Sequence, residues 1–313
     1  NDLALRIARE HTGGSGLIVT QNAYHGVTAA VAEISPALGH GVALGAHVRT
    51  VSAPDPHRAA AGDVGASFTA AVQAAIDDLL RHGIKPAALI VDTVFSSDGV
   101  FCEPAGFLQG AVAAIRAAGG LFIADEVQPG FGRTGDTMWG FQRHGILPDM
   151  ASLGKPMGNG YPVAGLVLRP EVVAEFGAKG RYFNTFGGNG TAVATAMAVL
   201  EVVEGEGLQA NAKAVGTYFR DGLRDLATRH EAIGDVRGVG LFLGVELVSD
   251  RATMAPDAPR TARIVNALRE ARILISATGP RANILKIRPP LVFSRANVDL
   301  FIDRLDQVMT RHP

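Results

Sequence analysis

The chain has 313 residues, of which 47% are hydrophobic and 19% are charged, and its formal net charge is −1. These values are typical of a soluble globular protein with one large domain or two ordinary ones. The near-neutral charge argues against nucleic acid as a partner, because surfaces that bind nucleic acid are strongly basic.

The single cysteine, Cys102, means that the chain cannot form an internal disulfide. This agrees with a reducing compartment, and we predict a cytoplasmic location. No activating motif surrounds Cys102, so we interpret it as an ordinary small residue and not as a nucleophile. Two stretches, 12–32 and 182–200, lack Asp, Glu, Lys and Arg, but their Gly, Asn and Thr content argues against a membrane span.

The first two thirds of the chain alternate between apolar runs and helical patterns. Residues 3–9 read as a helix that begins without a cap, and the sequence starts at Asn1 without a methionine, so we expect an N-terminal truncation. Further helices are predicted at 67–82, with Ser67 as N-cap, and at 106–118. Strands are predicted at 16–20, 87–95, 120–124, 150–153 and 163–168. This alternation predicts an α/β fold with a mostly parallel sheet covered by helices on both faces.

The texture of the sequence changes from about residue 191. Long helical patterns run to about 230, a glycine-punctuated strand region covers 234–248, and a helix is predicted at 259–271. Strands near Leu274 and Leu285 and a final helix follow, which is typical of a smaller α+β domain. We therefore divide the chain into a large domain, 1–205, and a small C-terminal domain, 206–313.

Two carboxylates, Asp125 and Glu126, end a buried strand in the segment GLFIADEVQPGFGRTG, residues 120–135. Open α/β sheets bind ligands at the carboxyl ends of their strands. A carboxylate buried there is costly unless a cation accompanies it. The protonated ring nitrogen of a pyridine cofactor is one such cation. A loop cap or a metal ligand would use the same residues, and this segment alone leaves those alternatives open.

A lysine, Lys155, follows another short apolar strand in DMASLGKPMGNGYPVAG, residues 149–165. A desolvated lysine becomes a nucleophilic amine, which is what imine formation with an aldehyde requires. The glycines around it would let the backbone approach a cofactor closely. Taken alone, the lysine would be read as a solvated loop residue. With Asp125 thirty residues earlier, also at a strand end, the cofactor interpretation gains weight.

Several motifs occur together in the order IADEVQPGFGRTG, GKPMGNGYPVAG and NTFGGN, followed by GDVRGVGLFLGVEL and LKIRPPL. In this order and spacing they resemble the class III aminotransferases of pyridoxal 5′-phosphate (PLP) fold type I, over essentially the whole chain. The resemblance implies PLP as cofactor and Lys155 as the Schiff-base lysine that also moves the proton. It implies that Asp125 pairs with the ring nitrogen, Val127 packs on one ring face and Gln128 lies near the ring hydroxyl. It implies no metal.

The same resemblance places other residues around the cofactor. Tyr24, in NAYHG, takes the aromatic position stacked on the second ring face, although a core tyrosine is the alternative. His25 would lie beside it among the cofactor-binding residues and face the substrate pocket. Thr185, in YFNTFGGN, matches the threonine presented to the phosphate of the neighbouring subunit's cofactor, which implies a homodimer with shared active sites.

Arg288, in KIRPPL, matches the arginine that binds a substrate carboxylate, while a surface salt bridge is its alternative. Arg133 and Arg237 also lie in family motifs, and we interpret both as structural. Many relatives have glutamate where this chain has Asp92, and proline where it has Thr93. These departures put in doubt whether Arg288 is switched by a glutamate, and with it the preferred amino donor.

Three functions are compatible with these residues. The leading prediction is an aminotransferase that moves an amino group between an amine or amino acid and an oxo acid. The GKPMGNG form also resembles a subgroup that includes alanine–glyoxylate aminotransferases and amino-alcohol phosphate phospho-lyases, so elimination of phosphate is the second. A non-catalytic protein that kept the fold is the third, and the presence of both Lys155 and Asp125 argues against it.

Overall fold

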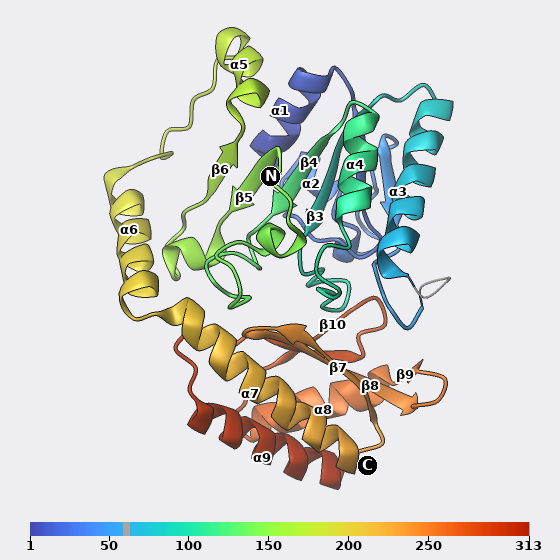
Figure 1. Ribbon diagram of the computed structural model, residues 1–313, viewed down its shortest axis with the longest axis vertical. Coiled ribbons are helices and arrows are strands. Elements are labelled where there is room, and N and C mark those ends of the chain that lie inside the picture. The colour runs from blue at the N-terminus through green and yellow to red at the C-terminus, as the bar shows by residue number, and fades with distance from the viewer. Residues whose placement is uncertain (59–62, 313) are drawn as a thin grey trace. The chain divides into compact units, whose positions relative to one another are not determined.

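The computed structural model describes residues 1–58 and 63–312. The chain forms two compact units (Figure 1). Unit 1 comprises Asn1–Thr93, Pro104–Phe131 and Trp139–Val202, and unit 2 comprises Val94–Glu103, Gly132–Met138 and Val203–Pro313. The boundary at residue 205, between the large and the small domain, stays a prediction.

The sheet of unit 1 has the strand order β2-β1-β3-β4-β5-β6. All neighbouring strands are parallel except β5 and β6, which are antiparallel. This confirms the predicted mostly parallel sheet. The strands are β1 (Gly16–Thr20), β2 (Val48–Val51), β3 (Pro86–Asp92), β4 (Leu121–Asp125), β5 (Met150–Leu153) and β6 (Gly165–Leu168).

Helices cover both faces of this sheet. On one face, α1 packs against α5, and its buried residues join side chains of β1, β3 and β4 such as Leu17, Ile90 and Ile123. Side chains alternate along a strand, so Ile18, Leu89 and Phe122 point to the other face, where they are also fully buried. There α3 packs against α4. The helices of this unit are α1 (Asp2–Thr12), α2 (Ala29–Ala32), α3 (Val64–Arg81), α4 (Gln109–Ala117) and α5 (Pro170–Lys179). Helix α6 (Gly190–Gly205) begins in this unit and ends in unit 2.

The predicted N-cap at Ser67 is wrong. Helix α3 begins at Val64, and the carboxylate of Asp63 accepts a hydrogen bond from the amide of Ala66 at 3.0 Å. Asp is as good an N-cap as Ser, and the apolar spacing used for the prediction does not separate the two. Ser67 therefore lies inside the first turns of the helix.

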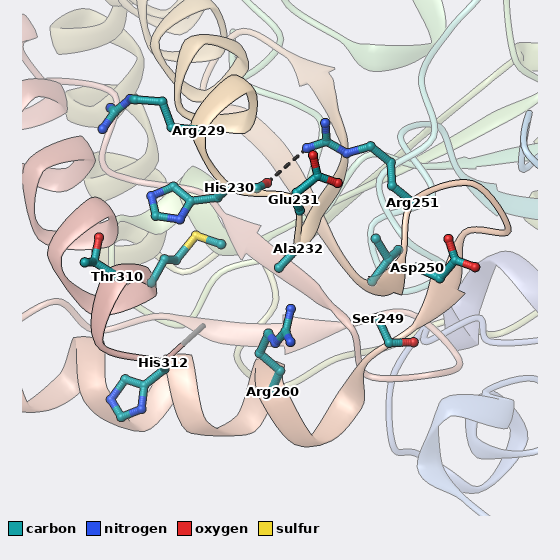
Figure 2. A pocket seen from close by; sticks show the side chains of 12 residues that line it. Arg229, His230, Glu231, Ala232, Ser249, Asp250, Arg251, Arg260, Thr310 and His312 are labelled. Atoms are coloured by element: carbon teal, nitrogen blue, oxygen red, sulfur yellow. Dashed lines mark hydrogen bonds between the residues drawn. The ribbon is translucent and has the colours of Figure 1, made fainter.

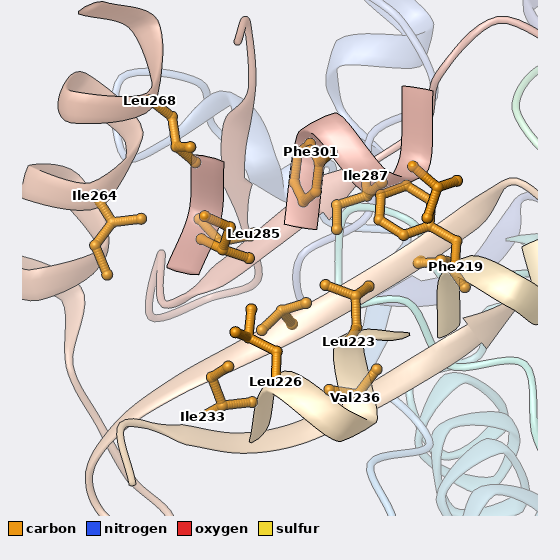
Figure 3. Close-up of a cluster of buried hydrophobic side chains, with 14 of the residues drawn as sticks. Phe219, Leu223, Leu226, Ile233, Val236, Ile264, Leu268, Leu285, Ile287 and Phe301 are labelled. Atoms are coloured by element: carbon orange, nitrogen blue, oxygen red, sulfur yellow. The ribbon is translucent and has the colours of Figure 1, made fainter. Parts of the chain in front are cut away.

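Unit 2 contains an antiparallel sheet with strand order β10-β11-β8-β7, and β9 pairs with β8. Its core is a cluster of buried side chains from α7, α8, α9 and the sheet, including Phe219, Leu223, Leu268 and Phe301 (Figure 3). The strands are β7 (Ile233–Val239), β8 (Phe242–Asp250), β9 (Ala255–Pro256), β10 (Ser276–Thr278) and β11 (Ile284–Ile287), and the helices are α7 (Leu208–Arg229), α8 (Ala258–Glu270) and α9 (Arg295–Arg311). This arrangement agrees with the predicted α+β part of the fold.

In the described part of the chain, no helix is both long enough and apolar enough to cross a membrane.

Candidate active site

The candidate site lies at the carboxyl edge of the parallel strands of unit 1. Asp92 at the end of β3 is the register partner of Asp125 at the end of β4, and Asp125 is the partner of Ser152 in β5. The chain then continues from β5 to Lys155. Parallel pairing therefore brings the two predicted residues, Asp125 and Lys155, to neighbouring strand ends.

Asp125 is a buried carboxylate that accepts several hydrogen bonds. The imidazole Nδ1 of His25 lies 2.7 Å from one of its oxygens, and the side-chain amide of Asn1 donates to the same oxygen at 3.0 Å. The backbone amide of Val127 donates to the other oxygen at 3.2 Å, and the hydroxyl of Ser152 lies 3.4 Å from it. Burial alone would raise the pKa of Asp125, but the bonds from His25, Val127 and Asn1 together hold it below its usual value. These hydrogen bonds thus favour the charged form of the Asp125 carboxylate.

His25 is fixed by the loop that follows β1. Its backbone amide donates to the hydroxyl of Ser35 at 3.0 Å, and only 1% of its side chain is exposed. A carboxylate can only accept, so Nδ1 carries the hydrogen that points to Asp125. In the described part of the chain the other ring nitrogen, Nε2, is buried without a hydrogen-bond partner.

Lys155 follows β5 in a strained backbone conformation. Its φ angle is +38°, which a non-glycine residue rarely adopts and which is often retained at functional sites. The short helix η3 (Lys155–Gly158) begins there, and the amide of Met157 donates to the carbonyl of Gly154 at 3.0 Å. The Lys155 side chain is exposed, and its amine has no hydrogen-bond or ion-pair partner in the described part of the chain. The desolvation expected from the sequence is therefore not supplied by neighbouring side chains.

The remaining residues predicted around the ring lie on adjoining turns. The methyl groups of Val127 lie 3.7 Å from the position that a Cβ on Gly154 would occupy, so Val127 borders the backbone that leads to Lys155. Gln128 is half-buried on the same turn as Val127. Tyr24, in the loop after β1, is 40% exposed, which differs from the core-tyrosine alternative.

Glu126, the second carboxylate of the segment, is fully buried on the other side of the strand end. It accepts hydrogen bonds from the hydroxyl of Thr93 at 3.0 Å and from the amides of Gly140 at 2.7 Å and Phe141 at 2.9 Å. Burial raises the pKa of Glu126 to about 7; these three bonds oppose the rise, and the nearby Asp92 adds to it. Glu126 is not part of the predicted site.

Two predicted site residues belong to other segments of the described chain. Thr185 is exposed in the segment between α5 and α6 of unit 1, and Arg288 is exposed after β11 in unit 2. Within unit 2, burial and then the charge of Arg288 lower the pKa of Arg133 to about 10. Arg133 donates to the carbonyls of Leu241 and Pro289, and Arg237 pairs with Glu246 at 2.7 Å. These contacts fit the structural interpretation of Arg133 and Arg237.

Unit 2 also contains a cavity of about 640 Å³ between the ends of α7 and α9 and strand β8 (Figure 2). Three of the basic side chains that line the cavity bind acceptors of unit 2. Arg229 and His230 share the carboxylate of Asp306, and Arg251 donates to the carbonyl of His230 at 3.0 Å, the bond drawn in Figure 2. None of the predicted site residues lines this cavity, so its size alone does not make it the candidate active site.

Comparison with known proteins shows the family of the chain. Residues 1–309 match the family described as aminotransferase class III. The chain belongs to the class III aminotransferases. It is 40% identical to an alanine–glyoxylate aminotransferase 2-like protein of Drosophila melanogaster, over 96% of this chain and 64% of that protein. The chain thus spans a little under two thirds of that curated relative.

Two solved structures extend the comparison. A phospholyase from Arthrobacter in complex with phosphoethanolamine is 41% identical, with a TM-score of 0.95, over 100% of this chain and 75% of that one. An amine transaminase from an uncultivated Pseudomonas species, solved with PLP bound, is 29% identical, with a TM-score of 0.89, over 100% of this chain and 74% of that one. The predicted PLP fold type I is therefore confirmed.

PLP is the cofactor of this family, and the residues at the strand ends fit it. The Asp125 carboxylate is held as an anion, which suits a protonated ring nitrogen, and the partner-free amine of Lys155 suits an aldehyde. The sequence motifs do not point to Asn1 and Ser152 as partners of Asp125. The position of Ser152 in the strand next to Asp125 was the available signal, while nothing local in the sequence pairs Asn1 with residue 125.

Two buried groups should give opposite pH dependences of stability. The raised pKa of Glu126, about 7 against 4.5, makes the folded state hold an extra proton, so stability falls as pH rises through that window. Burial lowers the pKa of His144 from 6.5 to about 4, so its contribution rises with pH instead. Glu126→Gln should therefore make the unfolding free energy climb more steeply than in the wild type between pH 4.5 and 6.5, by up to about 1.4 kcal/mol per pH unit.

Urea denaturation at several pH values measures this difference. The exposed Glu10→Gln is the control and should leave the pH dependence of the wild type unchanged. Parallel curves for Glu126→Gln and the wild type would show that Glu126 titrates normally in the fold.

Proposed function

We propose that the protein is a PLP-dependent aminotransferase that moves an amino group between an amine or amino acid and an oxo acid. The observation that carries this proposal is the buried, anionic Asp125, which is bonded to His25 at a strand end next to the one that leads to Lys155. A buried anion at this place could form an ion pair with the protonated ring nitrogen of the cofactor. Membership of the class III family and the transaminase among the similar structures support the same activity.

When bound, PLP supplies an electron-accepting ring that stabilises the negative charge left by removal of a substrate proton. Asp125 would keep a proton on the ring nitrogen, and the hydrogen bond from His25 favours the charged form of Asp125 and orients it. The amine of Lys155 would bind the aldehyde and remove the proton from the amine-bearing carbon of the donor. In the second half of the reaction it would add a proton to the corresponding carbon of the acceptor.

Other residues of the chain would orient the ring and the substrate. Tyr24 and Val127 would hold the two ring faces, and Gln128 would lie near the ring hydroxyl. Arg288 would bind the substrate carboxylate through two parallel hydrogen bonds, for which its exposed guanidinium is free of ion pairs in the described part of unit 2.

Labelling tests the central assignment. Borohydride reduction of the protein with PLP should leave a stable pyridoxyl group on Lys155, located by mass spectrometry of the digested chain. Lys155→Ala should abolish the label, whereas Lys179→Ala, which removes an exposed lysine of the same unit, should keep it. A label on another lysine, or no label on the wild type, would overturn the proposal.

A phospho-lyase is the second candidate, and the similarity to the Arthrobacter phospholyase favours it. In this reaction the same deprotonated substrate carbon would expel phosphate from its neighbour. We expect the protein to transfer an amino group from alanine to an oxo acid and to release no inorganic phosphate from phosphoethanolamine. Phosphate release that needs Lys155, without amino transfer from alanine or glutamate, would instead identify a phospho-lyase.

We also propose a homodimer in which Thr185 approaches the phosphate of the partner's cofactor. The segment around Thr185 exposes large apolar side chains, with Phe183 85% and Phe186 79% exposed, and α6 adds Val193 and Met197. An exposed apolar patch of this kind marks an interaction surface, and identical chains commonly pair through one shared patch.

A cytoplasmic location stays a prediction.

Replacing both phenylalanines tests the dimer. The double variant Phe183→Ser, Phe186→Ser should sediment as a monomer at micromolar concentration, while the wild type sediments as a dimer. Leu80→Ser removes a 53% exposed leucine from α3 and is the matched control, which should remain dimeric. A monomeric wild type, or a dimeric double variant, would contradict the assignment of this surface.

A further inference from the structure

Glu126 has no role in the proposed reaction, although it is a fully buried carboxyl next to Asp125. Burying such a group is costly unless its oxygens are satisfied, and here three donors converge on them: the Thr93 hydroxyl and the amides of Gly140 and Phe141. The backbone amide of Glu126 also donates to the carbonyl of Ser152 at 2.9 Å. One residue thus joins the ends of β3, β4 and β5 to the start of the short helix at 140–144.

These donors stand where the chain leaves and re-enters unit 1. Thr93 is the last residue of unit 1 before 94–103, and Gly140 and Phe141 follow directly after the return at Trp139. Glu126 itself lies five residues before the intervening exit at Phe131. Within unit 1, the carboxylate of Glu126 therefore binds the chain at two of these crossings, at Thr93 and at Gly140 and Phe141.

The packing around the carboxylate leaves little room for it to shift. A Cβ on Gly140 would lie 2.3 Å from the Thr93 hydroxyl oxygen and 2.7 Å from Cβ of Pro129. A Cβ on Gly130 would lie 2.7 Å from the carbonyl oxygen of Glu126. These approaches are possible only because both positions are glycine, and they pack the turn at 126–130 closely against Thr93 and Gly140.

We propose that Glu126 is a positioning residue of the active site, which holds the turn at 126–130 so that Asp125 and Val127 keep their places at the cofactor ring. The proposal rests on the proposed function, because it assumes that PLP binds at Asp125. The connection runs through Val127, whose amide donates to Asp125 and whose side chain borders Gly154. A turn released from Glu126 would loosen both contacts at once.

The test compares Glu126→Gln with a control that loses equivalent contacts at the other end of the sheet. Gln has the same size, but its NH₂ group must face at least one of the three donors and so loses that bond. Asp149 is the match: it is 5% exposed, precedes β5 at the amino edge, pairs with Arg116 at 3.0 Å and accepts from the amide of Phe122 at 2.8 Å. Asp149→Asn should therefore destabilise the fold without touching the site.

In the PLP-loaded protein, Glu126→Gln should weaken cofactor binding by about tenfold, as expected for the loss of one buried hydrogen bond. It should also shift the pH midpoint of the visible absorption change of the bound cofactor. Asp149→Asn should lower the melting temperature while leaving the cofactor affinity and that midpoint unchanged. Equal effects of the two variants on the midpoint, or none in Glu126→Gln, would overturn the role of Glu126.

Milder variants decide the question if Glu126→Gln does not fold. Thr93→Val removes one donor and should move the midpoint in the same direction, and Thr93→Ser, which restores the hydroxyl, should return it to the wild-type value. Failure of serine to restore the midpoint would overturn the proposal. A wild-type protein that binds no PLP would overturn the proposed function itself and the role of Glu126 with it.

Discussion

The charge on Asp125 is the constraint on which the rest of the candidate site depends. Taking a carboxylate out of water costs several kcal/mol unless hydrogen bonds replace the lost solvent. The partners come from four places in the chain: the start of α1, the loop after β1, the turn after β4 and strand β5. Each of these segments must be in position for the anion to be stable. The charge on Asp125 therefore depends on the correct folding of unit 1.

The adjacent carboxyl groups of Asp125 and Glu126 have opposite pKa shifts because their surroundings differ. Asp125 and Glu126 are both buried at the end of β4, but successive side chains point to opposite sides of a strand. Asp125 meets an imidazole and its pKa falls, whereas Glu126 meets only a hydroxyl and two amides, and burial raises its pKa to about 7. Pairs of groups separated in this way commonly divide their roles. In the proposed site Asp125 is the permanent anion and Glu126 is a structural acceptor.

Local patterns in the sequence predict the strands well, because a buried parallel strand is a continuous apolar run. The predictions for 16–20 and 150–153 coincide with β1 and β5. Strand β2 has only two buried residues and was not predicted, because the apolar residues of VRTV do not form a continuous run. The N-cap of α3 was misplaced for a related reason, since helical spacing locates a helix face and not its first residue.

The site was harder to predict than the fold, because its contacts join distant parts of the chain. The motifs single out Asp125 and His25, but their bond spans 100 residues and follows only from the pairing of strands between them. Likewise, the burial of Glu126 depends on Thr93, 33 residues earlier, and on Gly140, 14 residues later. The roles of Asp125 and His25 in catalysis stay predictions, as do those of Thr185 and Arg288.

Lys155 gives an independent physical reason to look for function at this edge. Its backbone has φ of +38°, a conformation that costs a non-glycine residue about 1–3 kcal/mol. Glycine would relieve that strain, and glycines already stand at 154, 158 and 160 in the same loop. The pairing of β5 and the bond from Met157 to Gly154 hold the strained turn in place. The proposed role of the Lys155 amine, as the group that binds the cofactor aldehyde, gives a reason for a lysine at this strained position.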